Sequence, residues 1–225
     1  MKFLFLVFLA TLLGGCATFG TMQTAETVGR GRVQMGLEPS VWQVGVEGAG
    51  SLALPSVGVS ARVGITDTVD IGGRIGSSGP EVMAKVQVTD PERTDLAVSV
   101  APSVAAFGIG VSGVSTTYVA IQVPVLVGLA VGPHQVVLGP KVHVSSSFAR
   151  VSDSTASAQL VGIGSSFGFA ARLGPRITLL PEVALVKPVY ASGSIDGSTA
   201  DLLGGTGIDV LYSQFSLGVL IDFGE

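Results

Sequence analysis

The chain is poor in cysteine, in charge and in aromatic side chains. Its 225 residues include one cysteine, and only 12% of them are charged and 6% aromatic. A single cysteine excludes an internal disulfide framework and a metal site built from several thiolates. Twelve basic side chains against 16 acidic ones give a net charge of −4, which argues against nucleic acid as a partner.

Long apolar runs are missing beyond the first segment. After residue 13 no stretch approaches the roughly 18 uninterrupted apolar residues that mark a transmembrane helix. The charged fraction is nevertheless about half of the ~25% found in ordinary soluble domains. The composition therefore fits neither a helical membrane protein nor a typical soluble domain.

Side chains that carry chemistry are also few. The two histidines, His134 and His143, are separated in sequence and form no metal-ligand motif, so neither a metal nor another cofactor is predicted. Closely spaced glycines from Gly162 to Gly168 lie within an expected strand. They are better explained as small side chains on one face than as a phosphate-binding loop.

The N-terminus has the parts of an export signal. Lys2 precedes an apolar stretch at 3–13, which is too short to cross a bilayer as a helix. The following stretch, Leu13-Gly14-Gly15-Cys16, resembles the lipobox of bacterial lipoproteins. The resemblance implies that residues 1–15 are a signal peptide, that cleavage occurs before Cys16, and that Cys16 is lipidated. Ala17, in place of the aspartate that retains such proteins at the inner membrane, points to the outer membrane.

The remainder alternates between apolar and small or polar residues with a period of two, which is typical of strands with two unlike faces. The clearest case is 119–131, where all seven odd positions are Val, Ile or Leu. Equivalent patterns predict strands at 57–65, 69–75, 82–88, 96–104, 136–144, 161–173, 177–185 and 215–223.

The connections between these strands alternate as well. Tight ones are expected at 66–68, 90–94, 132–134 and 174–176. Looser ones, rich in Gly, Ser, Thr and Asp, are expected at 77–80, 108–116, 149–157 and 192–207. Short turns at one end and long polar loops at the other are typical of outer-membrane barrels.

The face of each strand that carries the small and polar residues has too few charges for a surface exposed to water, because soluble surfaces carry about 25–35% charged residues. A narrow lumen suits it better, with the Val-rich face toward lipid and the closed ring satisfying every backbone donor. The charged residues expected in the lumen are Arg62, Asp70, Arg74, Lys85, Lys141, Arg172, Glu182 and Asp222.

This pattern resembles the small β-barrel proteins of bacterial outer membranes over residues 28–225. The fold class predicted is all-β, an antiparallel up-and-down transmembrane barrel of about ten strands, with eight or twelve as alternatives. In the first strand, expected within 30–47, the apolar residues lie at odd positions up to Leu37 and at even positions from Trp42 onward. This change suggests a bulge at 38–40. Bulges are also expected at Pro102, Pro124, Pro140 and Pro181, since proline removes a ladder donor. Residues 16–27 are expected to form a lipidated, polar periplasmic linker.

Three function classes remain open. The first is a non-enzymatic barrel that is structural, presents its loops, or forms a narrow pore for small solutes. The second is an enzyme, because His143 and Ser145 resemble the His-x-Ser of outer-membrane lipid A deacylases. Their phase points into the lumen, however, so a histidine hydrogen-bonded to a neighbour such as Gln122 is favoured over a catalytic one. The third is a soluble periplasmic lipid-binding lipoprotein with the apolar face inside.

The favoured hypothesis is an outer-membrane lipoprotein barrel anchored through Cys16, with its loops facing outside. Its expected partners are outer-membrane lipids and the machineries for barrel assembly and lipoprotein sorting. The sequence predicts no oligomeric state.

Overall fold

The computed structural model describes residues 19–46, 50–77, 79–93, 95–111, 113–151, 154–201 and 210–224. Cys16 and the expected signal peptide lie outside these residues. The described residues form no helix that is long and apolar enough to cross a membrane. Their strands are β1 (Val33–Val46), β2 (Gly50–Gly64), β3 (Val69–Gly76), β4 (Gly79–Gln87), β5 (Leu96–Val100), β6 (Ser103–Val111), β7 (Val114–Val131), β8 (His134–Val151), β9 (Ser154–Arg172), β10 (Ile177–Ile195), β11 (Ser198–Asp201) and β12 (Val210–Phe223).

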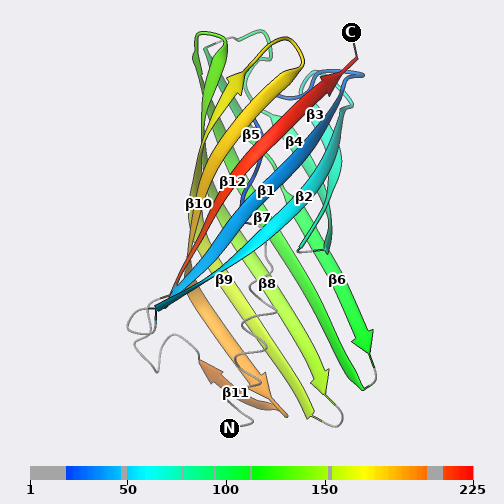
Figure 1. The fold of residues 1–225 in the computed structure, drawn as a ribbon, viewed down its shortest axis with the longest axis vertical. Helices are drawn as coiled ribbons and strands as arrows, with labels where there is room; N and C mark the ends of the chain where they lie inside the picture. The colour runs from blue at the N-terminus through cyan, green and yellow to red at the C-terminus, as the bar shows by residue number, and fades with distance from the viewer. Residues whose placement is uncertain are drawn as a thin grey trace.

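The strands close into an antiparallel ring (Figure 1). Each pairs with its neighbour in the chain, and β12 returns to pair with β1 along its whole length. β5 and β6 both lie between β4 and β7, so they are two parts of one barrel strand. β11 is an addition that pairs with the far end of β10. The barrel therefore has ten strands, as predicted.

The two ends of the barrel differ. The turn end carries the connections at 65–68, 88–95, 132–133 and 173–176, and the C-terminal strand β12 finishes there, at the top of Figure 1. At the opposite end, which we call the hairpin end, β7 to β10 extend well beyond β1 and β2. Much of 108–116 and 149–157, expected to be loops, is strand, because β6–β7 and β8–β9 continue pairing up to the short connections at 112–113 and 152–153.

The period-two pattern separates lipid from lumen as expected. The exposed large apolar side chains include Val57, Ile75, Val82, Ile121 and Leu138, and they belong to the outward face of the ring. With the apolar face outside, the soluble lipid-binding alternative is wrong. Such a surface is stable in hydrocarbon, because strands that pair around a closed ring satisfy one another's backbone donors and acceptors.

β1 contains no bulge, contrary to the prediction. Its pairing with β12 keeps one register from Leu37↔Val219 to Ser40↔Ser216. Trp42 is therefore inward, with 4% of its surface exposed. The shift of large residues from odd to even positions in β1 therefore reflects the lining of the lumen. Near the hairpin end the lumen is lined by large apolar and aromatic residues.

The prolines also behave differently from the prediction. Pro102 interrupts the strand between β5 and β6. Pro124, Pro140 and Pro181 are accommodated with the register unshifted on both sides. A register shift occurs instead between Pro188 and Tyr190, in β10. One missing donor weakens a ladder locally, but it does not force an extra residue into the strand.

A charge on the outward face should destabilise the barrel. Val125 is the middle one of the seven outward residues of β7 from Val119 to Val131. We expect Val125→Arg to lower the free energy of unfolding by about 2–4 kcal/mol, as for arginine near a bilayer midplane. Urea unfolding in lipid vesicles measures this, with the exposed turn variant Thr66→Arg as the control. Equal stability of the two variants would contradict the membrane assignment of this face.

Candidate functional site

The lumen is occupied by residues 19–28, which we call the lumenal segment. Its apolar residues recur at every third position, and all four are buried: Phe19, Met22, Ala25 and Val28. The segment was expected to be a periplasmic linker; the structure places it inside the barrel instead. The three-residue spacing of its apolar side chains is the sequence signal that could have revealed this.

The lumenal segment has a fixed direction. Phe19 lies among side chains closer to the hairpin end, including Tyr118 and Tyr212. Thr27 and Val28 lie at the turn end, where Thr27 donates its hydroxyl hydrogen to the carbonyl of Asp67. The chain then reverses into β1 through glycines with φ of +90° and +73°, Gly29 and Gly31.

Gly64 is essential to this reversal. The amide of Gly31 donates to the carbonyl of Gly64 at 2.9 Å. A Cβ at Gly64 would lie 1.9 Å from the carbonyl oxygen of Gly29. Any side chain at Gly64 would therefore displace the end of the lumenal segment.

Barrel side chains accept hydrogen bonds from the segment's backbone amides near Phe19. The amides of Phe19 and Gly20 donate to Gln214 Oε1 at 2.7 and 2.9 Å. Glu182 receives the amides of Thr21 and Met22 at 2.6 and 3.0 Å, and also the Thr21 hydroxyl at 2.6 Å.

The same recognition continues toward the turn end. Three further backbone amides donate to three side chains of the wall, each at 3.0 Å: Ala25 to Gln135, Thr27 to Gln87 and Val28 to Asp70. A chain without regular structure is thus hydrogen-bonded in a lumen where water is largely excluded.

Basic side chains bind the segment's carbonyls. Arg74 donates to Gly20 at 3.3 Å and Arg62 to Met22 at 3.0 Å. Three further wall residues donate to carbonyls of the segment: Lys141 to Phe19, Lys85 to both Thr24 and Glu26, and the hydroxyl of Ser99 to Ala25. The lumen charges and the backbone of the segment are therefore parts of one hydrogen-bonded unit.

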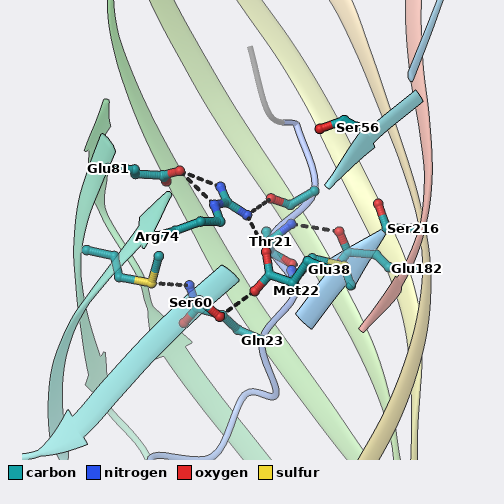
Figure 2. Close-up of polar contacts among 12 residues, drawn as sticks. Thr21, Met22, Gln23, Glu38, Ser56, Ser60, Arg74, Glu81, Glu182 and Ser216 are labelled. Atoms are coloured by element: carbon teal, nitrogen blue, oxygen red, sulfur yellow. Dashed lines mark hydrogen bonds and ion pairs between the residues drawn. The ribbon is translucent and has the colours of Figure 1, made fainter. Parts of the chain in front are cut away.

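Ion pairs connect the basic residues to the wall. Arg74 contacts Glu81 at 2.6 Å and Glu38 at 3.3 Å, so it joins β1, β3 and β4 while also reaching the segment (Figure 2). Lys85 and Asp70 pair at 3.1 Å. All five side chains are almost fully buried, and buried charges of this kind are costly unless paired and hydrogen-bonded.

The sequence prediction missed Glu38 and Glu81. Glu38 falls at the position expected to be a bulge, and Glu81 adjoins an expected loop. The alternation does indicate that both face the lumen, because Glu38 lies on the same strand face as Gln34, and Glu81 on the same face as Lys85.

The residues expected in the lumen divide into two groups. Arg62, Asp70, Arg74, Lys85, Lys141 and Glu182 are buried inside. Arg172 and Asp222 lie nearer the turn end and are less buried; Arg172 pairs with Glu26, and Asp222 accepts a hydrogen bond from Gln34 at 2.8 Å.

His143 and Ser145 also lie in the lumen, with 2% and 7% of their surfaces exposed. A deacylase-like pair would have to face lipid, and this pair does not. Asp153, the acidic residue nearest to this pair in the sequence, lies outside the described residues. The ring of His143 contacts Phe19 edge-on at 5.0 Å between centroids.

The hydrogen bond expected between His143 and Gln122 is absent. The two residues are paired across β7 and β8, but both ring nitrogens of His143 and the amide oxygen of Gln122 have no hydrogen-bond partner. They line a small space in the lumen together with Glu81, Ser103 and Tyr118. Within the described residues, no group of three His, Cys, Asp or Glu side chains could hold a metal ion.

Comparisons with known proteins find similar solved structures at low sequence identity. Neither a protein-family model nor a curated protein matches the chain. Among solved structures, Neisserial surface protein A is 13% identical, with a TM-score of 0.45, over 86% of this chain and 100% of its own. The outer membrane protein OprG from Pseudomonas aeruginosa is 11% identical, with a TM-score of 0.42, over 90% of this chain and 100% of its own. The outer membrane protease OmpT from Escherichia coli is 9% identical, with a TM-score of 0.46, over 85% of this chain and 96% of its own.

Weakening Glu182 should loosen the lumenal segment. Glu182→Gln removes the charge that accepts three hydrogen bonds from Thr21 and Met22, and bonds to a charged acceptor are worth about 1.5–3 kcal/mol each. We expect amide hydrogen exchange at Thr21 and Met22 to accelerate at least about tenfold. The matched control is Glu92→Gln, which changes an exposed residue at the turn end. Equal exchange in the two variants would show that Glu182 does not hold the segment.

Proposed function

We propose that the chain is a non-enzymatic outer-membrane lipoprotein barrel whose narrow lumen is closed by its own lumenal segment. The observation that carries the proposal is the hydrogen bonding of this segment to wall residues around the ring, including Glu182, Gln214, Arg74 and Lys85. At rest the barrel has a structural role and presents its extended hairpins outside the cell. Small solutes pass only when the segment leaves the lumen.

Lipidation at Cys16 is part of this proposal. The motif Leu13-Gly14-Gly15-Cys16 supports it, as does the barrel itself, which belongs in the membrane where the acyl chains would insert. Three acyl chains would make a stable anchor, since a single chain binds only marginally. Outer-membrane lipids are then direct partners, and the machineries for lipoprotein sorting and barrel assembly are the partners during export.

The direction of the lumenal segment bears on where the anchor lies. Phe19 is three residues after Cys16, and three extended residues span only about 10 Å. An anchor at the turn end would therefore require the segment to leave the lumen. With the segment seated, we propose that the lipid is held on the hairpin side of the barrel.

If the lumenal segment closes the lumen, the barrel should conduct ions only when the segment is displaced. In planar bilayers we expect the wild-type protein to stay closed. The double variant Phe19→Ala with Thr21→Pro should conduct, because it removes the ring against His143 and the amide and hydroxyl that donate to Glu182.

A matched control is Phe215→Ala, which removes a ring from the lipid face. It should stay closed like the wild type. A wild-type protein that conducts as much as the double variant would refute closure by the segment.

Lipidation has its own test. Cys16→Ser should abolish the acyl mass increment on the mature N-terminus and leave residues 1–15 attached, because the modified thiol is what the signal cleavage depends on in such proteins. Mass spectrometry of the purified protein measures both, with Ala17→Ser as the control. A Cys16→Ser protein that matures and assembles normally would overturn the anchor.

A further inference from the structure

The wall of the lumen recognises the lumenal segment mainly through its backbone. At least seven of its amides and six of its carbonyls bond to side chains of the barrel. Backbone groups are present in any polypeptide, so these contacts do not depend on the segment's own side chains. They do require a chain whose donors and acceptors are free of helix or sheet pairing and which turns at Met22, where φ is +48°.

Three side-chain positions add selectivity. The ring of Phe19 lies between His143 and Tyr212, with centroids 5.0 and 5.2 Å away. Met22 reaches Gly218, where an added Cβ would come within 2.7 Å of its terminal methyl group. Ala25 is fully buried in a cluster with Ala97, Ala101, Leu126 and Val137. The site therefore fits an aromatic residue, a methionine and an alanine at three-residue intervals.

The wall charges fit a neutral occupant. Its fully buried basic residues are Arg62, Arg74, Lys85 and Lys141, and its fully buried acidic residues are Glu38, Asp70, Glu81 and Glu182. Because the two signs balance, the lumen favours the dipoles of a peptide backbone over an ion of either sign. The same charges fix the direction of the occupant, since acids receive its amides and bases bind its carbonyls.

We propose that the lumen is a peptide-binding site for a chain without helix or sheet pairing that has the pattern aromatic-x-x-Met-x-x-Ala, and that the lumenal segment is its resident, exchangeable occupant. A separate peptide of this pattern binds the same groups once the segment is displaced. The inference rests on the proposed closure of the lumen by the segment, and it adds which peptides the wall residues can bind.

The test uses the full-length double variant Phe19→Ala with Thr21→Pro, whose wall residues are unchanged. A fluorescent synthetic peptide with the sequence of residues 19–28 is titrated against it in detergent, and binding is followed by fluorescence anisotropy. We expect binding to be at least tenfold tighter than to the wild-type protein, in which the site is already filled.

Two control peptides separate backbone recognition from unspecific adsorption. One carries N-methyl groups on the amides of its Thr21 and Met22, which removes the two amide donors to Glu182 while keeping every side chain. The other has the same composition in scrambled order. Both should bind at least tenfold more weakly than the native peptide.

Glu182→Gln in the double-variant background should weaken the native peptide more than the N-methylated one, which keeps only the Thr21 hydroxyl as a donor to Glu182. Equal binding of the native and N-methylated peptides, or no binding to the double variant, would overturn the inference. Conductance of the same variant is measured separately: a silent variant that binds the peptide refutes closure by the segment, whereas a conducting variant that binds none refutes the peptide site.

Discussion

Burial of an irregular stretch of backbone is the constraint on which the interior of this barrel depends. Residues 19–28 have no ladder of their own, yet they lie where little water can reach them. Each amide and carbonyl there loses a hydrogen bond to water and must find another partner. The wall supplies those partners as side chains, and this explains why so many of the charges in a charge-poor sequence lie inside the barrel.

The charges in turn depend on the segment. Arg74 is held by Glu38 and Glu81, and Lys85 by Asp70. Glu182 and Lys141, in contrast, bind an amide and a carbonyl near the Phe19 end of the segment. Removing the segment would leave these two side chains without those partners, at a cost typical of unpaired buried charges. The closed state is therefore favoured both by the backbone groups of the segment and by the charged side chains of the wall.

The sequence predicted the barrel well because alternation is a direct consequence of strand geometry. Ten strands, the outward Val and Ile face, and the inward position of Arg62, Asp70 and Lys85 all follow from phase alone. Features that depend on three-dimensional context were missed. Trp42 suggested a bulge because the large apolar residues up to Leu37 lie at odd positions, whereas the unshifted pairing of β1 with β12 points Trp42 inward. Glu38 and Glu81 were passed over because their neighbours looked irregular.

The lumenal segment was missed for a different reason. Its sequence is short and polar, and nothing local distinguishes Thr21 or Gln23 from linker residues. Its structure is set by Gln135, Glu182 and Gln214, which lie more than a hundred residues away along the chain. Long-range contacts of this kind leave little trace in local patterns.

The distance along the chain between these partners has a consequence for folding order. The amide of Phe19 and its acceptor on Gln214 are separated by 195 residues, and Thr21 and Glu182 by 161. The first described residues of the chain therefore have no binding site until β10 and β12 are in place. β12 also pairs with β1 to close the ring. The segment therefore binds in the lumen at the same late stage of folding at which the β1–β12 pairing closes the barrel. A segment that precedes every barrel strand in the sequence is thus among the last to reach its final position.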